Sequence, residues 1–78
     1  MEVKVLGPGC PNCEKTMNVV MDAIRESGIM ANVTKVTDYA EIAKMGVLST
    51  PGVVVDGQVK CAGKVPTKEE VISWLKGE

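Results

Sequence analysis

The sequence predicts an α/β fold: a four-stranded mixed sheet with helices on both faces and the element order β-α-β-α-β-β-α. Three observations carry this prediction. A short apolar strand at 2–6 runs into an amphipathic helix at 11–27. Residues 53–55 are all valine, and a strand that is apolar at every position needs cover on both faces. Asp56-Gly57 then marks a two-residue hairpin.

The first half of the chain reads as a β-α-β unit. Gly7-Pro8-Gly9 ends the first strand, and Gly28 ends the helix. The helix is expected to bury the apolar residues that recur at helical spacing, which are Met17, Val20, Met21 and Ile24. A strand at 31–36 follows, where β-branched residues favour extended structure. A right-handed crossover should make it parallel to the first strand.

The second half predicts a short helix, a hairpin and a last helix. Asp38 and Glu41 read as a capping box for a helix at 39–45, which Gly46 ends. The strands at 53–55 and 58–62 are antiparallel across the hairpin. A second capping box, Thr67 with Glu70, opens a helix whose apolar stripe is Val71, Trp74 and Leu75.

Composition limits the function classes. The 78 residues suggest one domain, 1–78, whose core is aliphatic because Tyr39 and Trp74 are the only aromatic residues. The net charge is −1 and no basic run occurs, so nucleic acid and anionic membrane are poor partners. The chain shows no signal-peptide pattern and no apolar run of membrane-spanning length. We therefore expect a cytoplasmic monomer.

The motif with most chemical content is Cys10-Pro11-Asn12-Cys13, at the start of the first helix. Unpaired N–H groups and the helix dipole stabilise a thiolate there. Pro11 fits the first helical position, where no backbone donor is lost. Cys13 shares the apolar face of the helix, whereas Cys10 is expected at or just before the N-terminus of the helix. An exposed thiol beside a shielded one suits disulfide exchange, in which Cys10 attacks and Cys13 resolves the mixed disulfide.

Other readings of the motif stay open. A zinc site would need carboxylates or a second chain, because the chain has no histidine. The remaining cysteine, Cys61, alternates with Val59 and is expected to face the core as a small hydrophobe. A soft-metal (Cu or Zn) carrier also places CxxC between a first strand and helix, but with the order β-α-β-β-α-β. A scaffold with a dormant CxxC is a third possibility.

Two segments together carry a family resemblance: Val5-Leu6-Gly7-Pro8-Gly9-Cys10-Pro11-Asn12-Cys13 and Gly46-Val47-Leu48-Ser49-Thr50-Pro51. With the Asp-Gly hairpin, they resemble the small microbial thioredoxin-like proteins called redox-active disulfide proteins, a minimal thioredoxin fold. The resemblance covers essentially the whole chain. It implies that Cys10 is the nucleophile and Cys13 the resolving thiol. The redox group would be the Cys10–Cys13 disulfide itself, with no separate cofactor.

The resemblance also implies a substrate platform and partners. It implies a cis Thr50–Pro51 bond beside the sulfurs, with the Thr50 backbone free to pair with an extended substrate segment. Pro11, Thr50 and Pro51 would then contact disulfide-containing client proteins. A thioredoxin-reductase-like flavoprotein is the expected electron donor, because Lys64 follows Gly63 where glutaredoxins carry paired glycines with an acidic residue. Lys4 stands where thioredoxins carry a buried aspartate.

Overall fold

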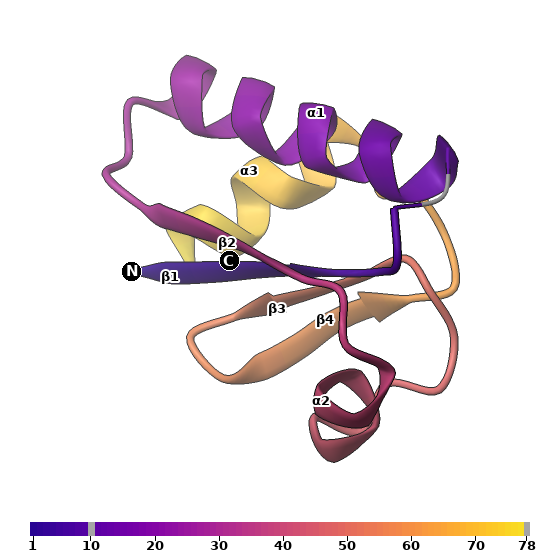
Figure 1. The fold of residues 1–78 in the computed structure, drawn as a ribbon. Coiled ribbons are helices and arrows are strands. Elements are labelled where there is room, and N and C mark those ends of the chain that lie inside the picture. Colours follow the sequence, from indigo (N-terminus) through magenta and orange to yellow (C-terminus); the bar gives the residue numbers. More distant parts are fainter. Residues whose placement is uncertain (10, 78) are drawn as a thin grey trace.

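The computed structural model describes residues 1–9 and 11–77, and it has the predicted order of elements (Figure 1). The elements are β1 (Glu2–Leu6), α1 (Pro11–Ser27), β2 (Asn32–Val36), α2 (Tyr39–Lys44), β3 (Gly52–Val55), β4 (Gln58–Ala62) and α3 (Lys68–Lys76). Each boundary that the sequence predicted lies within one residue of the observed one; no end was predicted for the last helix.

The four strands form one mixed sheet in the order β2-β1-β3-β4. Strand β1 pairs with β2 in parallel, with Val3 opposite Val33, and pairs with β3 antiparallel, with Val3 opposite Val55. Strands β3 and β4 form the antiparallel hairpin, whose register shifts between Val53 and Val54. The two central strands are therefore β1 and β3, and β2 and β4 lie at the edges.

The helices cover both faces of the sheet, as predicted. Helices α1 and α3 pack together on one face, and α2 lies on the other (Figure 1). All four residues of β3 are buried, which is what a strand covered on both faces requires. The larger core lies under α1 and α3 and consists of Val3, Val5, Val20, Ala23, Val53, Val55, Cys61, Val71 and Leu75. The smaller core lies under α2 and consists of Leu6, Ile42, Val47 and Val54.

The buried stripe of α1 differs from the predicted one. Its buried members are Cys13, Thr16, Val20 and Ala23. Met17 and Ile24 border this stripe, and Met21 is 48 % exposed, so the prediction that Met21 is buried was wrong. The reason is that α1 packs against α3 as well as the sheet, which turns its Met21 side toward the open space beside β2.

Most of the predicted caps and turns are present in the structure. Thr67 and Glu70 form the predicted capping box, with reciprocal 3.2 Å hydrogen bonds. Asp38 does cap α2, but its side chain accepts a hydrogen bond from the N–H of Ala40. In a capping box the donor would be the N–H of Glu41. Asp56 and Gly57 both have positive φ, 48° and 83°, as a type I′ hairpin turn demands.

Within the described residues, no helix has the length and apolar character needed to cross a bilayer.

Candidate functional site

The start of α1 carries the part of the CxxC motif that the structure describes. The helix begins at Pro11, which is exposed, so Pro11 does occupy the first helical position. Cys13 follows in the same turn, and its side chain is 1 % exposed, which confirms that it faces the core. The predictions for Cys10 concern a residue outside those described.

Cys13 packs directly over the end of β1, at Gly7. Val3 and Val5 of β1 face α1, and the alternation of a strand puts position 7 on the same side. A Cβ added to Gly7 would lie 2.2 Å from Cys13 Sγ and 3.1 Å from Cys13 Cβ. Only glycine therefore leaves room for this sulfur. The Gly7 N–H donates to the Val36 carbonyl at 2.8 Å, which fixes the chain here against the end of β2.

The loop before β3 approaches the same place. Thr50 Cβ lies 3.8 Å from the position that a Cβ on Gly7 would take, so Thr50 and Cys13 converge on Gly7. Thr50 is partly exposed, and Pro51 is fully buried. The Thr50–Pro51 bond is cis, which confirms what the resemblance implied. The Pro51 carbonyl accepts a 2.8 Å hydrogen bond from the Gly63 N–H, so the loop is fastened to the end of β4.

Thr16 is a buried polar residue of the site that sequence reasoning missed. It is 0 % exposed, and its Oγ1 donates to the Asn12 carbonyl at 2.8 Å. This bond satisfies the buried hydroxyl and ties it to the turn that carries Cys13. The signal was its spacing, because a residue three positions after Cys13 shares the Cys13 face of the helix. Gly7 was missed as well, since it reads as a turn residue although the strand alternation continues through it.

Lys4 lies away from Cys13. It is partly exposed, and it alternates with Val3 and Val5, which places it on the α2 face of β1. Its partners across the sheet are Thr34 and Val54. The lysine that replaces the aspartate of thioredoxins is thus separated from the buried sulfur by the sheet. The polar environment that favours a thiolate at this site is the start of α1, with its unpaired N–H groups and positive dipole end.

Cys61 behaves as predicted for a core residue. It is 8 % exposed, belongs to the larger core, and its sulfur lies 3.9 Å from the Lys64 carbonyl. Burial raises the pKa of its thiol, which keeps it protonated and unreactive. Within residues 1–9 and 11–77, no three Cys, Asp or Glu side chains form a cluster that would hold a metal ion.

Comparison with known proteins gives a consistent answer. The family model for a thioredoxin domain matches residues 1–76. A thioredoxin of Methanocaldococcus jannaschii is 42 % identical over 80 residues, covering 97 % of this chain and 92 % of the relative. A thioredoxin of Methanothermobacter thermautotrophicus is 35 % identical over 71 residues, covering 91 % and 92 %. A probable thioredoxin of the same organism is 28 % identical over 74 residues, covering 91 % and 86 %.

Proposed function

The chain belongs to the thioredoxin family and is thus a thiol–disulfide oxidoreductase, and on that premise we propose that it reduces protein disulfides through Cys10 and Cys13. The observation that carries the assignment of roles is the burial of Cys13 against Gly7 in the first turn of α1. A sulfur so enclosed has no access to a client protein. The thiol that attacks the client is therefore assigned to Cys10, and Cys13 acts second, on a bond already formed at the site.

The reaction balances in two exchanges. The Cys10 thiolate attacks one sulfur of the client disulfide, which forms a mixed disulfide and expels the other client sulfur as a thiolate. The Cys13 thiolate then attacks the Cys10 sulfur, which expels the second client thiolate and leaves a Cys10–Cys13 disulfide. The client has gained two electrons and, from solvent and Cys13, two protons. An external reductant returns two electrons and two protons to the pair.

The client would be held by the loop before β3. Thr50 is partly exposed beside Cys13, and its backbone offers groups that pair with an extended segment, as in strand addition. Pro51 is fully buried and has no N–H, so it would position the Thr50 backbone rather than contact the client as the resemblance implied. Pro11 is exposed at the start of α1 and supplies an apolar contact. Thr50 and Pro11 are proposed as the client-binding surface, and Pro51 as the residue that holds Thr50 in place.

The proposed partners follow from this chemistry. The clients are disulfide-containing proteins, and the electron donor is a flavoprotein of the thioredoxin-reductase kind, the donor that thioredoxins generally use. The proposed place of the reaction is the cytoplasm, where thiols are kept reduced and a Cys pair is more often catalytic than structural. The proposed midpoint potential of the dithiol lies in the range of thioredoxins and glutaredoxins, roughly −270 to −200 mV.

Single cysteine variants test the assignment of roles. With a disulfide-containing client protein, Cys13→Ser should accumulate a mixed disulfide through Cys10, and Cys10→Ser should show no exchange. Cys61→Ala is the matched control, because it removes the third cysteine and should retain turnover. Mixed disulfides trapped by Cys10→Ser instead would overturn the assignment. Absence of a two-electron couple together with tight Cu(I) binding would support the soft-metal carrier instead.

A further inference from the structure

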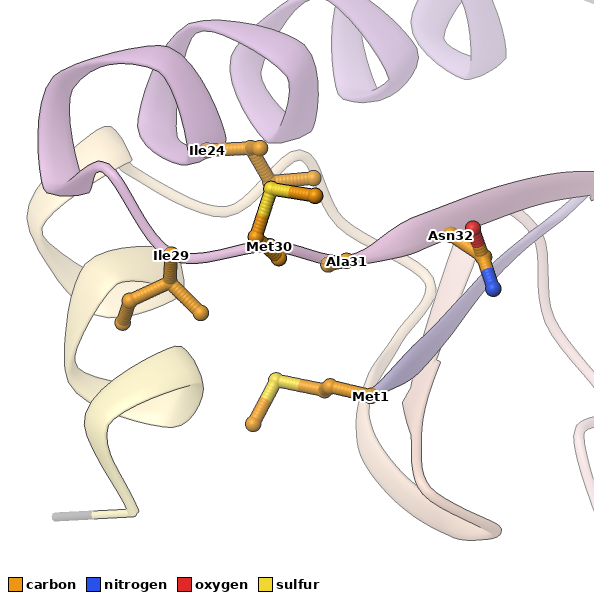
Figure 2. Close-up of a pocket in the computed structure, with 6 residues that line it drawn as sticks. All are labelled: Met1, Ile24, Ile29, Met30, Ala31 and Asn32. Atoms are coloured by element: carbon orange, nitrogen blue, oxygen red, sulfur yellow. The ribbon is translucent and has the colours of Figure 1, made fainter.

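An apolar groove lies between α1 and the open side of β2. It consists of two adjoining pockets of about 320 and 460 Å³, which share Ile24, Ala31 and Asn32. The first pocket is completed by Met1, Ile29 and Met30, and Figure 2 shows these side chains around it, from the start of β1 and the segment that leads into β2. The second pocket is completed by Met17, Met21, Val33 and Lys35. We call the two pockets together the β2 groove.

The lining of the β2 groove has a simple chemistry. Its side chains are apolar except for Asn32 and Lys35, so Lys35 has the one charged side chain among the described lining residues. Met30 is 90 % exposed and Met21 is 48 % exposed. Methionine side chains are flexible and polarizable, which lets them adapt to an apolar group of a partner.

The backbone beside the groove is free to bind. The Asn32 N–H donates to the Met1 carbonyl at 2.9 Å, and the Val36 carbonyl accepts from Gly7 at 2.8 Å, so both residues turn their polar groups toward β1. In a parallel strand the N–H and C=O of one residue point to the same side, and successive residues alternate. Val33 and Lys35 therefore point theirs outward, where β2 has no neighbouring strand. The side chains of the same two residues line the groove.

We propose that the β2 groove binds an extended segment of a partner protein, which adds as a strand to β2. Val33 and Lys35 supply the backbone hydrogen bonds, as in other cases of strand addition. The partner places an apolar residue opposite Val33, over the methionines, and an acidic residue opposite Lys35. Cross-strand pairs of this kind are the unit of recognition between strands. The motif on the partner is thus an apolar and an acidic residue separated by one position.

Two alternatives fit less well. The other edge strand, β4, carries an extra residue, Lys60, where its register with Val53 and Val54 of β3 shifts, and a bulge twists an edge away from further pairing. A second copy of the chain, paired antiparallel over the whole of β2 about a two-fold axis at Thr34, would bring the two Lys35 side chains to diagonal positions. Like charges at that spacing oppose association. An acidic partner segment meets neither obstacle.

The test uses the full chain and a synthetic peptide, acetyl-Ser-Val-Thr-Glu-Thr-Val-Ser-amide, whose central acid has an apolar residue two positions away on either side. We expect saturable shifts of the backbone amide signals of Val33 and Lys35 on titration. Lys35→Glu should weaken binding by about two- to fivefold, the range of an exposed charge pair. The peptide with lysine in place of glutamate should bind Lys35→Glu more tightly than it binds the unmodified protein. Lys60→Glu on β4 is the matched control and should change nothing.

A backbone variant separates strand addition from simple charge attraction. Val33→Pro removes an outward N–H from an edge strand, a place where proline is tolerated, and should abolish saturable binding. Reduction of a small-molecule disulfide should stay at the unmodified rate in Lys35→Glu and Val33→Pro. Equal binding of both peptides by both Lys35 forms, or saturable shifts confined to other elements, would overturn the proposal. So would concentration-dependent self-association that shifts the same amides without peptide.

Discussion

The sulfur of Cys13 occupies the space that a side chain on Gly7 would fill, with only 2.2 Å between Sγ and the position of a Cβ. The two residues come from the end of β1 and the first turn of α1, so the missing side chain sets how closely that turn approaches the sheet. Thr50 borders the same space. The position of the buried sulfur therefore depends on a residue with no functional group.

Replacing Gly7 with alanine should displace Cys13. The added methyl cannot share the space with the sulfur, so we expect the free energy of unfolding to fall by about 1–3 kcal/mol, the usual range for overpacking. Because the resolving sulfur is displaced, the mixed disulfide with a client should also last longer. Urea unfolding measures the first effect, and single-turnover release of client measures the second.

Gly52→Ala is the matched control for that variant. Its added Cβ would lie 3.0 Å from Val47 Cγ1, in the smaller core under α2. It should also lower stability, but it should leave the release rate unchanged. If Gly52→Ala slows release as much as Gly7→Ala, the effect of position 7 is one of stability alone.

Cys61 should be chemically silent in the folded protein. Burial raises the pKa of its thiol, so we expect it to be alkylated only after unfolding, as peptide mapping with and without urea would show. The folded protein favours the neutral thiol of Cys61 more than the unfolded chain does. This stabilisation is complete below the pKa of the thiol in the unfolded chain, about 8.5, and it is lost as the pH rises through the higher pKa in the folded protein. The stability advantage of the protein over Cys61→Ala should therefore shrink in alkaline solution. Rapid alkylation of native Cys61 would contradict this picture.

The capping box of α3 should show its own pH dependence. The pKa of Glu70 lies below its ordinary value of 4.5, first because the Thr67 N–H donates to the carboxylate and also because Lys64 is nearby. The ionised carboxylate therefore stabilises the fold above about pH 4.5, and this is lost as pH falls through the folded pKa. The difference in unfolding free energy between the protein and Glu70→Gln should shrink on acidification. Glu69→Gln, which makes the same charge change outside the capping box, is the control.

Helix α2 should be the element most sensitive to a single core substitution. The smaller core under it has four buried members, and Ile42, 2 % exposed, is the one that α2 supplies. Ile42→Ala should lower the free energy of unfolding by about 2–5 kcal/mol, the range for deleting a large buried side chain. Tyr39→Ala on the exposed side of the same helix should change it by about 0.5 kcal/mol or less. Chemical denaturation compares the two, and equal losses would mean that Ile42 does not anchor the helix.

The sequence predicted what depends on local pattern. Element order, the Thr67 cap, the hairpin turn and the burial of Cys13 each follow from spacing or from a residue type over a few positions. The burial of Met21 was predicted wrongly because periodicity does not fix how a helix is rotated against its neighbours. Helix α1 also contacts α3, where Lys68 pairs with Glu26, and this contact sets the rotation. The role of Gly7 depends on Cys13 and Thr50, which meet only in the folded chain.

The hairpin turn and the start of α1 lie at opposite ends of the sheet. Asp56 and Glu2 exchange two 2.8 Å hydrogen bonds at the beginning of β1, whereas Gly7 and the start of α1 follow its other end. The turn is therefore a suitable place for a linker to an electrode or a bead. A protein attached there would present the start of α1 to the solution, so attachment and thiol–disulfide exchange would use different surfaces.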